Sequence, residues 1–184
     1  AVFKETLECD FAISLEDSDR FRVNVFNQRG HVGMVLRRIQ SNVPTVEELG
    51  FPEALSQMSL LKRGLILMVG ATGSGKSTTL AAMINHRNQN SADHILTIED
   101  PIEFSHKNIK SIVNQREIGV DTKSYANALK ASLREAPDVI LVGEIRTRET
   151  MEAALELSNT GHLALSTLHA NNAGQAIERV INMF

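Results

Sequence analysis

The sequence has little cysteine, no long apolar run and no excess of basic residues. Its single cysteine, Cys9, cannot form an internal disulfide, and one Cys with six His offers no cluster at metal-ligand spacing. Nucleic-acid-binding proteins usually carry an excess of basic residues, whereas the net charge here is −3. We therefore expect no nucleic-acid partner. With no run of about 18 apolar residues and no signal-peptide pattern, we expect a cytoplasmic protein that reaches a membrane only through partners.

The strongest motif is a glycine-rich octapeptide at residues 70–77, which reads GATGSGKS. It follows the apolar run 65–69 and precedes a helical pattern, the order that a phosphate-binding P-loop requires. Glycines let backbone N–H groups turn inward, the following helix adds its positive end, Lys76 supplies a cation and Ser77 a ligand for Mg²⁺. We therefore predict a nucleotide site formed by Gly70, Thr72, Gly73, Ser74, Gly75, Lys76, Ser77 and Thr78.

The first 42 residues have a different pattern from the rest of the chain. Apolar side chains alternate with polar or small ones over 11–15, 21–25 and 32–36, which predicts half-buried antiparallel strands. The stretch 27–30 between the last two runs predicts a hairpin, with Gly30 tolerating positive φ. Because so little sheet cannot make a core alone, we expect part of a small α+β domain.

Residues 43–58 are interpreted as a linker, and residues 59–184 as the larger domain. Within the linker, Pro44 and Pro52 bracket a short helix, for which Thr45 and Glu48 predict a capping box. In the larger domain, strand-like apolar runs (65–69, 95–98, 139–142 and 163–168) alternate with helical patterns (124–136 and 147–160). This alternation predicts a doubly wound α/β fold.

In such a sheet, residues that follow the strands line the ligand site. Glu99, Asp100 and Glu103 follow the run 95–98, and a hydrolase needs one carboxylate for the attacking water and others for hydrated Mg²⁺. The alternative is an ordinary acidic turn.

Two further strand ends carry candidate residues. Glu144 follows the run 139–142, as the acid of a Walker B motif does, except that Gly143 stands where Asp is usual. Glu144 either contacts Mg²⁺ through water or polarises the attacking water. His169 follows the run 163–168 and His162 precedes it; each either senses phosphate or is satisfied by backbone carbonyls. Arginines far in sequence from the P-loop are solvated, or reach a phosphate from a neighbouring subunit.

The chain resembles the type IV pilus retraction ATPases of the secretion-ATPase superfamily. The resemblance rests on the stretches 20–30, 98–104, 113–117, 137–146, 161–162 and 167–171, together with the P-loop. Residues 143–146, 148–152 and 168–173 look more like the accessory retraction ATPases than the main ones.

This resemblance implies a RecA-like P-loop NTPase core, a partial N-terminal PAS-like domain and a missing C-terminal part. It also implies a hexameric ring that binds ATP and Mg²⁺ between subunits. Glu103 matches the catalytic glutamate, Glu144 the Walker B glutamate and a Mg²⁺ ligand, and His162 and His169 the His box. Arg22, Arg37 and Arg29 match arginines that reach a nucleotide, and Glu99 and Asp100 are expected at the cofactor.

The resulting hypothesis is an ATP-driven motor subunit for pilus retraction and twitching motility. Its expected partners are a sister retraction ATPase and an inner-membrane platform protein, which would hold it at the cytoplasmic face of that membrane. One alternative is an ATPase for pilus assembly or type II secretion. The other is a nucleotide-binding accessory subunit that hydrolyses little ATP itself.

Overall fold

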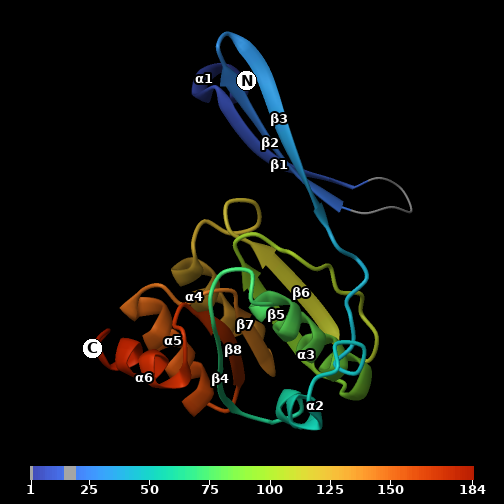
Figure 1. Ribbon diagram of the computed structural model, residues 1–184, viewed down its shortest axis with the longest axis vertical. Helices are drawn as coiled ribbons and strands as arrows, with labels where there is room; N and C mark the ends of the chain where they lie inside the picture. The colour runs from blue at the N-terminus through green and yellow to red at the C-terminus, as the bar shows by residue number, and fades with distance from the viewer. Residues whose placement is uncertain (1, 15–19) are drawn as a thin grey trace. The chain divides into compact units, whose positions relative to one another are not determined.

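A computed structural model describes residues 2–14 and 20–184, which form two compact units. Unit 1 comprises the chain up to Asn42 together with Glu103–Ser105. It contains α1 (Val2–Thr6) and an antiparallel sheet of β1 (Glu8–Ser14), β2 (Arg20–Gln28) and β3 (His31–Ile39), paired in that order (Figure 1). Residues 103–105 join this unit because the backbone N–H groups of Gln40 and Ser105 donate to the carbonyls of Glu103 and Gln40, respectively.

The hairpin between β2 and β3 has the two-residue loop Arg29-Gly30, both with positive φ (48° and 81°). That conformation matches the twist of antiparallel strands, and its positive φ explains why glycine occupies position 30. The predicted strands are therefore present, but their expected half-burial is wrong for β3. Val32, Met34 and Leu36 are 62, 60 and 49% exposed, because in the described part of unit 1 nothing packs over these side chains. Leu15, which the alternation also included, lies outside the described residues.

Unit 2 comprises Val43–Ile102 and His106–Phe184, and so includes residues 43–58, which the sequence predicts to be a linker. The capping box is formed: the Thr45 N–H donates to the Glu48 carboxylate at 2.9 Å, and the Glu48 N–H donates to Thr45 Oγ1 at 3.1 Å. The helix that it was expected to start is instead a turn over residues 46–50, and α2 (Glu53–Ser59) begins directly after Pro52. Pro52 ends the turn because the residue before a proline avoids the helical region.

The sheet of unit 2 has five parallel strands in the order β4-β8-β7-β5-β6. They are β4 (Gly64–Val69), β5 (His94–Glu99), β6 (Ile112–Glu117), β7 (Val139–Val142) and β8 (Leu163–Leu168). The three central strands are almost fully buried, as expected for parallel strands covered on both faces. This arrangement confirms the α/β prediction.

Helices cover both faces of this sheet (Figure 1). On one face, Leu80, Met83 and Ile84 of α3 (Lys76–Asn90) pack against a cluster that includes Ile95. On the other face, Leu96 and Ile98 meet α4 (Tyr125–Glu135) and α5 (Arg148–Asn159). Farther along, α6 (Ala173–Ile181) and α5 cover β4 and β8. Successive residues of β5 thus face opposite cores, as the period of two of a strand requires.

Four of the described elements were not predicted from the sequence: α1, α2, β6 and α6. The strand β6 reads IVNQRE and lies at the sheet edge, where all of its side chains except that of Glu117 are exposed or partly buried, so its apolar signal is weak. Among the helices of the described residues, none is long and apolar enough to cross a membrane.

Candidate active site

The P-loop connects β4 to α3 at the carboxyl edge of the unit 2 sheet. Gly70, Gly73 and Gly75 have φ values of 152°, 76° and 90°, which side chains other than glycine rarely adopt. Gly75 is the N-cap of α3, and no side chain caps this helix. The first N–H groups of α3 are therefore available to an anion, so the loop fits a phosphate.

Lys76 is folded back onto its own loop. Its Nζ donates hydrogen bonds to the Gly70 carbonyl at 2.9 Å and to the Ala71 carbonyl at 2.8 Å. These contacts hold the ammonium group at the loop. When a phosphate binds, the group can donate to phosphate oxygens in place of the two carbonyls. Ser77 and Thr78 lie half-buried in the first turn of α3. Thr72 and Ser74 are exposed within the loop.

The ends of β7 and β8 are joined by a charged cluster, Glu144, Arg146 and His169. The two oxygens of Glu144 bond different partners: Oε2 accepts from Arg146 Nη2 at 2.6 Å, and Oε1 lies 2.8 Å from His169 Nε2. The Glu144 side chain is only 17% exposed, whereas Arg146 is 67% exposed. The hydrogen bond to Glu144 and its charge raise the pKa of Arg146.

Backbone and hydroxyl contacts hold these two strand ends together. Thr167 Oγ1 donates to the Gly143 carbonyl at 2.8 Å, and Ser166 Oγ donates to the Val142 carbonyl at 2.6 Å. The Ile145 N–H then bonds the Thr167 carbonyl at 2.9 Å. Glu144 and His169, which are far apart in sequence, meet because β7 and β8 are neighbours in the sheet.

The acidic stretch after β5 is divided between the two units. Glu99 ends β5, and its Oε1 accepts hydrogen bonds from Thr97 Oγ1 at 2.6 Å and Gln115 Nε2 at 3.3 Å. Asp100 follows it in unit 2, whereas Glu103 is an exposed residue of unit 1. Glu117 was not among the predicted site residues. It is buried and accepts from the Ile102 N–H at 3.2 Å, so it holds the turn that leads to Glu103.

His162 lies at the opposite edge of the sheet from the P-loop. It directly precedes β8, its carbonyl accepts from the Gly64 N–H at the start of β4, and its Nδ1 lies 3.1 Å from the Leu157 carbonyl. Six residues of strand separate it from the carboxyl edge, about 20 Å at roughly 3.3 Å per residue. His162 therefore lies far from the P-loop of its own chain, and its expected role at the cofactor stays a prediction.

The predicted arginines of unit 1 are neighbours on the antiparallel sheet. Arg22 of β2 and Arg37 of β3 are paired in register, and Arg29 lies in the hairpin loop. The two paired residues therefore place their cationic side chains on adjacent strands.

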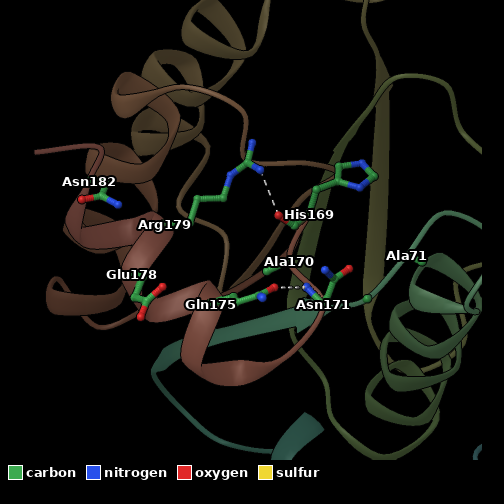
Figure 2. A pocket seen from close by; sticks show the side chains of 9 residues that line it. Ala71, His169, Ala170, Asn171, Gln175, Glu178, Arg179 and Asn182 are labelled. Carbon is green, nitrogen blue, oxygen red and sulfur yellow. Dashed lines mark hydrogen bonds between the residues drawn. The ribbon is translucent and has the colours of Figure 1, made fainter.

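A polar cavity of about 500 Å³ opens beside the first residues of the P-loop. Figure 2 shows His169 and Asn171 on one side of it and the polar side chains of α6 on the other. Arg179 Nη1 donates to the His169 carbonyl at 2.9 Å, and Gln175 Oε1 accepts from the Asn171 N–H at 3.2 Å. The unpredicted helix α6 thus helps to hold the segment that carries His169.

The model of the family described as "Type II/IV secretion system protein" matches residues 8–184. The chain belongs to this family. It is 60% identical over 182 residues to the type IV pilus ATPase PilU of Pseudomonas aeruginosa, covering 99% of this chain and 48% of that protein. It is 52% identical over 182 residues to the retraction ATPase PilT of the same organism, covering 99% of this chain and 53% of PilT.

A crystal structure described as the pilus retraction motor PilT with bound ADP superimposes with a TM-score of 0.95 at 51% identity. It covers all of this chain, which spans 53% of that chain. The chain thus spans about half the length of the curated relatives it matches. These findings confirm the resemblance to the pilus retraction ATPases and the α/β fold, and the N-terminal antiparallel sheet fits the small domain that was expected.

Proposed function

We propose that the chain is the ATP-hydrolysing part of a type IV pilus retraction motor. The observation that carries this proposal is the open P-loop with Lys76 at its mouth, at the same sheet edge as Glu144 and His169. The similarity to PilT, whose structure contains ADP, supports a nucleotide at this loop. The similarity to PilU and PilT favours retraction over assembly or type II secretion.

Each residue of the site has a task in this proposal. The amides of the P-loop and Lys76 hold the phosphates, each charge-assisted hydrogen bond contributing roughly 1.5–3 kcal/mol. Ser77 and Glu144 hold Mg²⁺, which supplies charge neutralisation at the phosphates when bound. Because both oxygens of Glu144 are engaged, Arg146 and His169 orient it. Glu103 then serves as the base for the attacking water.

We further propose that the motor is a homohexamer whose nucleotide sites lie between subunits. Arg22 and Arg37 would reach the nucleotide of a neighbouring subunit, and closure between domains would convert hydrolysis into movement. The expected partners are a sister retraction ATPase and the inner-membrane pilus platform protein, which would place the motor at the cytoplasmic face of that membrane.

Steady-state ATP hydrolysis of the intact protein and of Lys76→Ala tests the proposal. We expect a measurable rate for the parent and a loss of at least about 100-fold in the variant, because at least two charge-assisted hydrogen bonds are removed. Turnover that Lys76→Ala leaves unchanged would refute hydrolysis at this site.

A second candidate is an accessory subunit that binds ATP but hydrolyses little of it. The higher identity to PilU than to PilT favours it, on our interpretation of PilU as the accessory member. It predicts that hydrolysis rises when a sister retraction ATPase is added and that this rise is lost with Lys76→Ala.

A further inference from the structure

Tyr125 is the first residue of α4 and lies at the carboxyl edge of the sheet. The helix start is fixed by Ser124, whose Oγ accepts from the Asn127 N–H at 3.2 Å. The aromatic ring packs against the buried cluster formed by β5, β7 and α4. Its polar end therefore lies where β5 and β7 end, among the groups of the proposed site.

The hydroxyl of Tyr125 occupies the space beside Gly143. A Cβ added at Gly143 would lie 3.1 Å from this hydroxyl, 3.2 Å from the Ile98 carbonyl and 3.3 Å from Glu99 Cα. Two of these neighbours are backbone atoms of the adjacent strand, so a side chain at 143 would be crowded. This crowding explains why position 143 holds glycine and not the Asp that usually ends such a strand. The hydroxyl of Tyr125 lies beside the position that the Asp side chain would take.

The charges around Tyr125 favour a neutral hydroxyl. Burial raises the pKa of Tyr125, and the negative charges of Asp100, Glu144 and Glu99 raise it further, against the opposing effect of Arg146. No hydrogen bond joins this hydroxyl to another described residue, so its proton is available to water. A carboxylate at position 143 would instead add a fourth negative charge and repel the other three.

On the basis of the proposed ATPase function, we propose that Tyr125 is a positioning residue for hydrolysis. Its hydroxyl donates a hydrogen bond to water held between the carboxylates of Asp100 and Glu144, and so sets the place of that water. The phenol thereby places an uncharged hydrogen-bond donor beside the position of the missing strand-end Asp, whose carboxylate could only accept. Because Tyr125 contacts this water and not ATP, its hydroxyl acts on the rate more than on ATP binding.

The test is Tyr125→Phe in the intact protein, because phenylalanine keeps the packed ring and removes only the oxygen. We expect kcat for ATP hydrolysis to fall about tenfold, which corresponds to about 1.4 kcal/mol. The KM for ATP and the thermal unfolding midpoint should stay at the parent values. Ser132→Ala is the matched control, since it removes a hydroxyl of the same helix that, among the described residues, bonds the Leu129 carbonyl alone.

A second measurement compares the affinities of parent and variant for Mg·ADP and for Mg·ADP with aluminium fluoride. We expect Tyr125→Phe to weaken only the aluminium fluoride complex, by the same factor as kcat. Parent values of kcat and of this affinity in Tyr125→Phe would overturn the role of Tyr125 and leave the ATPase proposal intact. A joint loss of kcat, ATP affinity and thermal stability would also overturn it, in favour of packing alone. A parent protein that binds neither complex would overturn both proposals.

Discussion

Glu103 and Glu144 differ in how free their carboxylates are. Glu144 is held by Arg146 and His169 at 2.6 and 2.8 Å, whereas Glu103 is an exposed side chain. A general base has to exchange protons with water, so the held carboxylate is the poorer candidate for that role. This difference supports the proposed roles, with Glu144 as the Mg²⁺ ligand and Glu103 as the base.

For Glu103→Gln we expect ATP hydrolysis to slow by about 10²–10⁴-fold, because general-base assistance has that magnitude. The affinity for ATP should stay near the parent value, since the amide keeps the size of the side chain. Single-turnover hydrolysis and nucleotide binding measure the two quantities separately. A hydrolysis rate in Glu103→Gln equal to that of the parent would exclude Glu103 as the base and leave Glu144 as the candidate.

His106 makes stability depend on pH. Its Nδ1 is buried without a hydrogen-bond partner among the described residues, and burial lowers its pKa from 6.5 to about 4. Between these values the unfolded chain binds the proton more strongly than the folded one. Stability is therefore full above about pH 6.5 and is lost as the pH falls towards 4.

We expect His106→Leu to reduce this pH dependence. The parent should lose about 1–3 kcal/mol more than the variant between pH 7 and pH 4, as the shift in pKa requires. Urea unfolding of both proteins at several pH values measures the difference. Parallel stability curves for the two proteins would contradict the assignment.

At the scale of elements, the ends of β5, β7 and β8 are held at close spacing around Gly143. Three neighbours lie within 3.3 Å of a Cβ at this position, and two of them belong to the backbone of β5. We expect Gly143→Ala to lower the free energy of unfolding by about 1–3 kcal/mol, the usual cost of overpacking. Chemical denaturation measures the loss.

Gly174→Ala is the matched control for this prediction. Gly174 lies in α6, and a Cβ there would meet only Asn172 Oδ1, at an ordinary 3.4 Å. This change should leave stability unchanged or raise it by about 0.4–1 kcal/mol, because alanine loses less backbone entropy in a helix. Equal losses in both variants would rule out crowding as the cause.

At the scale of the whole molecule, the residues predicted to act on ATP are divided between the two units. Arg22 and Glu103 belong to unit 1, and the P-loop belongs to unit 2. If Arg22 acts on the nucleotide of a neighbouring subunit, Arg22→Ala should slow hydrolysis by about 10³–10⁵-fold, as loss of an arginine supplied in trans does. Nucleotide binding through the P-loop should be retained.

Mixing Arg22→Ala subunits with Glu103→Gln subunits should restore part of the activity. In a mixed ring, some sites combine an intact Arg22 from one subunit with an intact Glu103 from its neighbour. ATP hydrolysis of mixtures at several ratios measures this complementation, with co-assembly shown by a tag on one variant. Mixed rings that co-assemble but stay as inactive as either parent variant would mean that the arginine acts within its own subunit.

The sequence by itself determined the P-loop, the alternation of strands and helices, and the acids that follow β5 and β7. These features depend on neighbouring residues, because side-chain periodicity, glycine conformation and strand-to-helix order are local properties. The sequence also predicted a hairpin within residues 27–30 with positive φ at Gly30, and the structure has its loop at Arg29-Gly30.

Only the tertiary structure decided which strand ends meet. The order β4-β8-β7-β5-β6 joins Glu144 to His169, leaves His162 at the far edge and brings Tyr125 beside Gly143. It also made an edge strand of the polar stretch 112–117. These outcomes follow from hydrogen bonding between strands far apart in sequence, and no local pattern encodes that pairing.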